Sequence, residues 1–422
     1  MNPPSDSAAA TPTTRRSMVV RVVLGLLIVL YFFRFAEYHW GMMPTYSPVG
    51  DCLMKGEPLA PCAHSFPYPP LFALLMVPLT FLPMWARNVV WYGVLVSATY
   101  GCFRICETLA VTAFQVAREE LFRVRLFSVI LSLKFVLSVF ENQAYDALVF
   151  FFMLLGLSGL SQNRTIGAAS GLATATALKP TPVLMLLYAL FLRRWAVFAL
   201  GVGVWVTLSL LPDLFFTPKQ PGPGYLRTWI MDVAIGGLLG TSPDAYYPLL
   251  KDTGFLNQSL KGLVFNIVHG RLSADLAVHA RTILYAVYLV YGLAALAILL
   301  LSTKAEGALV WGASIVLISM LLLSPVSSKS HFVVLLLPHM AIVAYLIRHR
   351  EAWRAVAPLL CASFALNTLT SKGFMGGELS DEMLSRGCIT LGTLLLLAAI
   401  AVIVLRSRKA PRLPLGERPL AG

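Results

Sequence analysis

The residues best suited to chemistry in this chain are polar side chains that interrupt long apolar runs. Ionisable groups at membrane depth are costly, so each is a candidate functional residue. A polar stretch from Glu37 to Pro83 concentrates acids and histidines and carries two cysteines. Four further stretches follow along the chain: Glu141-Asn142-Gln143 with Asp146, Lys179-Pro180, Asn257-Gln258-Ser259, and Ser324 to His331.

These residue types suit the transfer of a sugar from a lipid phosphate to a hydroxyl. A carboxylate or histidine takes the proton of the acceptor. Cations stabilise the phosphate as it leaves, and apolar helices accommodate the lipid tail. We expect the catalytic residues to be Asp51, ranked first as general base, then Glu37, together with His331. We expect substrate to be bound by Lys179, Lys329, Asn142, Gln143, Asn257, Gln258 and Tyr68.

Each candidate also has a plainer explanation. Asn142 and Gln143 suit a helix cap or a hydrogen bond to a neighbouring helix. Lys179 can extend its ammonium group to the membrane interface. Asp51 and Glu37 suit solvated loop acids, and a histidine like His331 is common at the headgroup level. The functional interpretation is favoured because the expected topology puts these groups on one side of the membrane.

The composition is that of a membrane protein. The chain has 422 residues, of which 58% are hydrophobic and 13% charged. Soluble domains are nearer half apolar and a quarter charged. The net charge of +13 comes from basic residues that flank apolar runs, a pattern typical of cytoplasmic loops rather than of a nucleic-acid surface. We therefore predict an all-α integral membrane protein with about 12 transmembrane helices and no nucleic-acid partner.

We expect three regions along the chain. Residues 1–17 form a disordered cytoplasmic tail, residues 18–405 the transmembrane domain, and residues 406–422 a basic cytoplasmic tail. Within the domain, residues 37–70 form the first extracytoplasmic loop and residues 215–281 a long one. Six apolar segments lie between the first loop and Arg193, although alternation requires an odd number. The suspected irregular segments are the pair around Lys179-Pro180 and the region Val111–Arg125.

The sequence leaves two points of chemistry undecided: the state of the cysteines Cys52 and Cys62, and the need for a metal ion. Cys52 and Cys62 form a disulfide in an oxidising compartment or remain two thiols, and their spacing does not decide between these states. No cluster of metal ligands supports a metal or another cofactor, although a divalent cation is compatible with the chemistry.

Several motifs together resemble one family, the polyprenyl-phosphate-sugar-dependent glycosyltransferases of family 87, which have the multi-span GT-C fold. The resemblance runs in order from Val22 to about Ile347. It implies inverting transfer of a hexose, typically mannose, from a polyprenyl-phosphate-sugar to a lipid or glycan hydroxyl on the outer face of the inner membrane. The matching motifs are Phe66-Pro67-Tyr68-Pro69-Pro70-Leu71, Glu141-Asn142-Gln143, Gly167 through Lys179-Pro180, Asn257-Gln258-Ser259-Leu260, and Ser324-Pro325 through His331-Phe332.

The chain departs from the family pattern in its first loop. An aspartate is expected near Met42 to Thr45, and no acid stands there. Asp51 and Glu37 are the substitutes, and Asp146 is a further candidate whose depth in a span favours a structural hydrogen bond. The alternative functions are a transporter or lipid flippase, for which we see no inverted repeat, and a family member that has lost catalysis.

Overall fold

The computed structural model describes residues 25–36, 42–63, 66–219, 221–239, 241–243, 255–271 and 278–407. Within these ranges the chain is helical and contains no strand. Six of the described helices are long and apolar enough to cross a membrane. The predicted class, an all-α polytopic membrane protein, is confirmed.

The long helices follow the predicted apolar segments closely, because backbone groups in hydrocarbon must be satisfied within the segment. The helix Gly25–Ala36 comes first. The others are α5 (Met84–Phe114), α6 (Leu121–Glu141), α7 (Asp146–Ser161), α8 (Thr165–Leu178), α9 (Val183–Phe191), α10 (Trp195–Phe215), α16 (Ala280–Ser302), α17 (Ala308–Leu323), η4 (Lys329–Leu335) continued by α18 (Leu336–Arg348), α19 (Trp353–Phe364) continued by η6 (Ala365–Leu369), and α22 (Cys388–Ser407).

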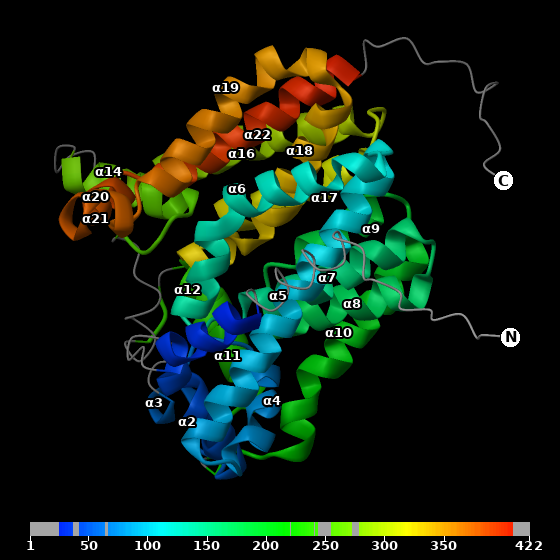
Figure 1. The fold of residues 1–422 in the computed structure, drawn as a ribbon. Helices are drawn as coiled ribbons and strands as arrows, with labels where there is room; N and C mark the ends of the chain where they lie inside the picture. The colour runs from blue at the N-terminus through cyan, green and yellow to red at the C-terminus, as the bar shows by residue number, and fades with distance from the viewer. Residues whose placement is uncertain are drawn as a thin grey trace, which may run out of the picture.

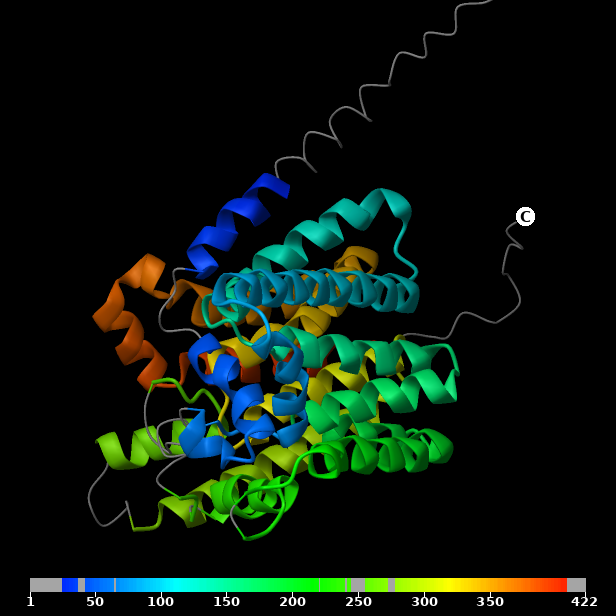
Figure 2. The same cartoon turned by 90° about the horizontal axis from the view of Figure 1, so that it is seen from below.

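The short helices gather at one end of this bundle, which we call the site end (Figure 1). Figure 2 shows the same grouping for the short helices coloured blue and orange. All of them except α4 lie in segments that the sequence predicts as loops. They are α2 (Met43–Met54), α3 (Leu59–Cys62), α4 (Pro70–Thr80), α11 (Tyr225–Trp229), α12 (Gly236–Leu239), α14 (Leu260–Arg271), α20 (Lys372–Met375) and α21 (Gly377–Ser385).

Hydrogen bonds between segments far apart in sequence hold the site end together. The backbone N–H of Met42 donates to Asn142 O at 2.9 Å, and that of Gln258 donates to Ser327 O at 2.7 Å. The Gln258 side chain donates to Leu384 O at 2.8 Å. The candidate stretches from three parts of the sequence therefore share one end of the bundle.

The opposite end is joined by its own contacts. His349 Nε2 lies 2.9 Å from Glu306 Oε2, and Arg350 lies 3.9 Å from Glu120. The short connections here include Arg164 and the turn after α9. The helices therefore run between two ends of the bundle, and each end is stabilised by its own contacts.

Helix α4 corresponds to the first of the six apolar segments between the first loop and Arg193. It has 11 residues, about 16 Å of helix, whereas a span needs about 30 Å. It packs so closely on α2 that a Cβ added to Gly50 would lie 2.8 Å from the Met76 backbone. Arg87 joins its end to α2, donating to Thr80 O and to Ser47 Oγ. Helix α9 is shorter still, with nine residues, so it is the close packing on α2, and not its length, that distinguishes α4 from the helices α5 to α9 that follow it.

Helices α7 and α8 meet through small residues. A Cβ on Gly171 would lie 2.5 Å from Gly156 N, and one on Gly159 would lie 2.5 Å from Ala168 N. Small residues let helix backbones approach closely in membranes. The contact matters for the site because α7 begins at Asp146 and α8 ends just before Lys179.

We expect Gly171→Ala to destabilise the protein by about 1–3 kcal/mol, because its methyl group overfills the α7–α8 contact. Gly167→Ala is a matched control on the same helix, since its Cβ would meet nothing within 4 Å. Thermal unfolding in detergent measures both variants. Equal melting temperatures for the two would contradict the close contact.

Candidate active site

Three predicted or suspected residues meet in one buried cluster. Lys179 Nζ donates to Asp146 Oδ1 at 2.6 Å, and both side chains are largely buried, with exposed fractions of 14% and 7%. His331 Nε2 lies 3.7 Å from the same oxygen. Desolvated charges are costly unless they are paired, so the carboxylate and the ammonium stabilise one another here.

Local sequence explains how each member reaches the cluster. Asp146 lies in the first turn of α7, where a helix N-terminus favours an acid. Pro180 cannot extend α8, so Lys179 follows its last turn in extended conformation. His331 lies in the first turn of η4, where Ser328 and His331 form a capping box.

The capping contact orients the imidazole ring. The Ser328 N–H donates to His331 Nδ1 at 3.3 Å. Since Nδ1 accepts this bond, the proton of the neutral ring lies on Nε2, which faces Asp146. His331 is therefore set to donate from Nε2 toward the carboxylate or toward an anion that enters the cluster.

A small pocket opens on the cluster. Its volume is about 20 Å³, room for about one water molecule. The rest of its wall is mostly apolar, and Asp146 is the only acid among its described lining residues. The lining residues are Asp146, Val149, Met153, Lys179, Thr181, Met320, Leu321, Ser324, Ser327, His331 and Val334.

Gln143, three residues before Asp146, forms hydrogen bonds with three helices: Gly25–Ala36, α2 and α5. Its side chain accepts from Met43 N–H at 3.1 Å and donates to Phe35 O at 2.9 Å. Its own carbonyl accepts from Trp91 Nε1 at 2.9 Å. Its φ of +53° makes the tight turn from α6 to α7. The structure gives Gln143 the role of positioning α7, and with it Asp146; substrate contact by Gln143 stays a prediction.

The other amide candidates also bond within the protein. Asn142 donates to Ser138 O at 2.8 Å and so closes the end of α6. Asn257 donates to Pro325 O at 3.0 Å and accepts from Ser327 N–H at 3.1 Å. Gln258 reinforces the same junction. These bonds shape the turn that carries His331, and direct substrate binding by the amides stays a prediction.

Tyr68 belongs to an aromatic group beside the cluster. Its ring lies 5.7 Å from that of Tyr46 and 4.9 Å from that of Tyr145. Tyr145 in turn lies 5.7 Å from Lys179 Nζ, a cation–π contact. Burial raises the pKa of Tyr46 and Tyr68, so both phenols stay protonated. Tyr46 follows directly after the positions where the family pattern expects an aspartate.

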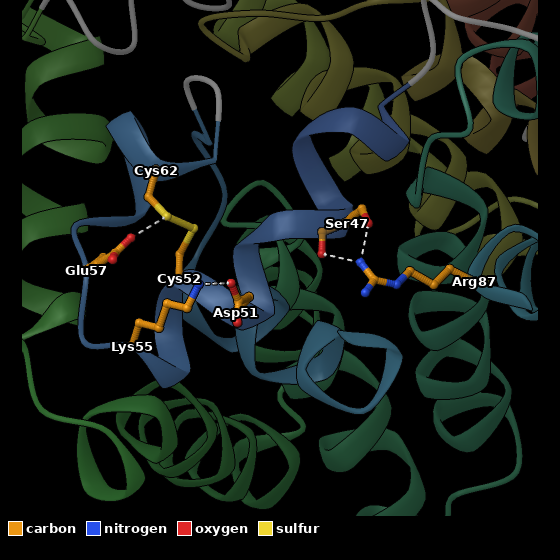
Figure 3. The surroundings of a disulfide bond; sticks show 7 residues. All are labelled: Ser47, Asp51, Cys52, Lys55, Glu57, Cys62 and Arg87. Atoms are coloured by element: carbon orange, nitrogen blue, oxygen red, sulfur yellow. Dashed lines mark hydrogen bonds and ion pairs between the residues drawn. A yellow bond between two sulfur atoms is a disulfide. The ribbon is translucent and has the colours of Figure 1, made fainter. Parts of the chain in front are cut away.

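Asp51 lies elsewhere, on the surface of α2 (Figure 3). Its carboxylate pairs with Lys55 at 2.6 Å, and about half of its side chain is exposed. Asp51 lines a second pocket, of about 640 Å³, together with Ser47, Met84 and Arg87. None of the residues of this pocket lines the Asp146 pocket. The structure therefore does not bring Asp51 together with Lys179 and His331.

Cys52 and Cys62 are joined in a disulfide, which fastens α3 to α2 (Figure 3). Glu57 lies near the bridge, with Oε2 3.0 Å from Cys62 Sγ. The two sulfurs are bonded to each other and are not available as thiolate ligands. This group of three side chains therefore does not suit a metal ion.

Glu37 lies outside the described residues. Lys329 is described and lies at the start of η4, two residues before His331, but it does not line the Asp146 pocket. Of the predicted site residues, the structure thus brings together Lys179 and His331, around Asp146, whose depth favours a structural hydrogen bond.

The sequence model of glycosyltransferase family 87 matches residues 66–325, more than half of the chain. The chain belongs to glycosyltransferase family 87. It is therefore a membrane glycosyltransferase, and the transporter alternative is set aside. The matched range includes Asp146 and Lys179.

A likeness to one solved structure is also found. It is ArnT from Cupriavidus metallidurans bound to undecaprenyl phosphate, with 13% sequence identity and a TM-score of 0.38, covering 95% of this chain and 79% of that chain. Comparison with curated protein sequences finds no match.

We expect thiol counting to show the disulfide directly. Of the 6 cysteines in the chain, the described free ones are Cys102, Cys106, Cys361 and Cys388. The denatured protein should therefore add four maleimide groups before reduction and six after it, as measured by mass spectrometry. Six adducts without reduction would show that Cys52 and Cys62 remain thiols.

We expect Lys179→Met to destabilise the protein by about 3 kcal/mol, because it leaves the Asp146 carboxylate buried without its ammonium partner. Asp146→Asn in the same chain should recover part of the loss. The matched control is Lys55→Met, which breaks an exposed ion pair that contributes little to stability. Unfolding in detergent compares them, and equal losses for the two lysines would contradict a buried pair.

Proposed function

We propose that the protein transfers a hexose, with mannose as the first candidate, from a polyprenyl-phosphate-sugar to a lipid or glycan hydroxyl, with inversion at the anomeric carbon. Family membership supports the reaction class. The single observation that carries the choice of site is the buried Asp146 carboxylate, which Lys179 and His331 contact at one pocket.

The three side chains divide the chemistry between them. The acceptor oxygen attacks the anomeric carbon, the bond from that carbon to the phosphate oxygen breaks, and the phosphate leaves with the electron pair. Lys179 and the Nε2–H of His331 stabilise the charge on this phosphate. Asp146 takes the proton of the acceptor hydroxyl. A phosphate that draws Lys179 toward itself frees Asp146 Oδ1 to accept that proton.

Asp51 and Glu37 remain the alternative general bases. Asp51 is favoured by its position in the first loop, near where the family pattern expects an aspartate. Asp146 is favoured by its contacts with the two residues expected to hold phosphate. Replacing each acid in turn by its amide, and measuring sugar transfer, distinguishes these alternatives.

We further propose that the site end faces outward from the inner membrane. The short connections at the opposite end hold Arg118, Arg164, Arg193, Arg194 and Arg350, as expected for cytoplasmic loops. The disulfide at the site end suits an oxidising compartment. On this topology the polyprenyl donor and the acceptor both reach the pocket from the outer leaflet.

We expect Asp146→Asn to lower transfer by at least about 100-fold, the usual effect of losing a general base. Asp51→Asn, the same change on the exposed acid, should leave transfer within about twofold, since a surface ion pair contributes little. The assay uses the full chain in nanodiscs with labelled polyprenyl-phosphate-mannose and lipid extracts, and polyprenyl-phosphate-glucose in parallel.

The opposite pattern, loss in Asp51→Asn and retention in Asp146→Asn, would assign the base to Asp51. If sugar transfer is lost only in Glu37→Gln, Glu37 is the general base. If the unaltered protein binds the donor but transfers no sugar, the protein is a family member that has lost catalysis.

A further inference from the structure

One helix of the long loop between α10 and α16 exposes an apolar face. Residues Tyr225–Leu239 form a continuous helical run, in which α11 is followed by the π-helix η2 (Ile230–Ile235) and then by α12. Its larger exposed apolar side chains are between 37% and 55% exposed. A helix with apolar side chains on one face and a basic residue beside them suits a membrane surface. The described exposed residues of the run are Arg227, Ile230, Met231, Ala234, Ile235 and Leu239.

The other side of this helical run is attached to the protein. Tyr225 is buried, and so is Gly236. The indole Nε1 of Trp229 donates to Pro67 O at 2.9 Å. The run is therefore amphipathic: one side packs on the site end, and the described residues leave the other side exposed.

The end of α10 places the run at the level of the membrane surface. Asp213, in the last turn of α10, accepts from the N–H groups of Tyr225 at 2.6 Å and Leu226 at 3.0 Å. Leu214 and Phe215, next to Asp213, are 73% and 69% exposed. Since α10 is long and apolar enough to cross a membrane, these exposed side chains contact lipid. The run therefore begins beside the lipid-facing end of a span.

The same helix is connected to the candidate active site. Trp229 holds the carbonyl of Pro67, and the ring of the next residue, Tyr68, lies 4.9 Å from that of Tyr145. The ring of Tyr145 lies 5.7 Å from Lys179 Nζ. A contiguous set of contacts thus joins the helix to the ammonium group at the pocket.

We propose that Tyr225–Leu239 is a membrane-surface helix, which inserts its apolar face into the leaflet at the site end. Its partner is the lipid bilayer itself, because the apolar side chains suit the boundary between headgroups and acyl chains and Arg227 can extend its guanidinium group to the headgroup level. Through Trp229, this contact with lipid holds the segment Phe66–Pro70 beside the pocket. The proposal applies whichever side of the membrane the site end faces, so it does not rest on the proposed function.

Spin labels measure the depth of the helix. Met231→Cys and, as an exposed acidic control on α21 at the same end, Glu378→Cys are each labelled with a nitroxide. Both are made in the full chain with Cys361→Ser, which removes the exposed free thiol. In nanodiscs of phosphatidylcholine, collisions with oxygen and with a water-soluble nickel complex are compared. The label at position 231 should lie about 5–10 Å below the headgroup boundary, and the label at position 378 should lie in water.

Hydrogen exchange in the same nanodiscs tests the connection to the active site. Met231→Glu places a charge on the apolar face, which is costly in lipid, and should lift the helix from the leaflet. Amide exchange in the peptide that carries Phe66 and Tyr68 should then be faster than in the unaltered protein. Met231→Leu, which keeps the face apolar, is the matched control and should leave the exchange unchanged.

Two results would overturn the proposal. One is a label at position 231 that is as accessible to nickel as the label at position 378, or that neither oxygen nor nickel reaches. In the first case water covers the face, and in the second case protein does, either another part of this chain or a second copy. The other result is unchanged exchange in Met231→Glu, which would show that the helix does not hold the segment Phe66–Pro70. Ile235→Cys repeats the depth measurement should Met231→Cys fail to label.

Discussion

The ion pair between Asp146 and Lys179 is the interaction on which the rest of the site depends. A charge inside a membrane bundle is tolerated only with a partner, and here each group is the partner of the other. The pair fixes the start of α7 against the end of α8 and leaves one carboxylate oxygen shared with His331. Hydrogen bonds of Gln143 and Asn257 hold the segments that carry Asp146 and His331 in place.

Much of that support comes from residues that do no chemistry. Gln143 bonds α2, α5 and the helix before α2 through one turn, and Asn257 holds the loop that leads to His331. A buried amide bonds in several directions at once, so it suits such junctions. Amides that attract attention as possible substrate ligands thus turn out to be structural ties in the resting protein.

The helices were predictable because apolar runs of membrane length allow few alternatives. The exception was α4, whose composition resembles that of a span although the helix packs against the short helix α2. The importance of Asp146 was harder to foresee: the sequence shows its depth, but not that Lys179, just after the end of α8, pairs with it. Pairing of Cys52 with Cys62 was likewise undecided, since it depends on how α3 folds back on α2.

The glycine contact between α7 and α8 has a consequence for how the two charges are spaced. Where backbones touch without intervening side chains, neither helix can slide along the other without a collision. The backbones that carry Asp146 and Lys179 are then held at a fixed separation, while the lysine side chain can still turn toward a phosphate. This rigid helix contact keeps the ends of α7 and α8 in register while lipid substrates enter and leave. The surrounding loops must then adapt to differences in substrate shape.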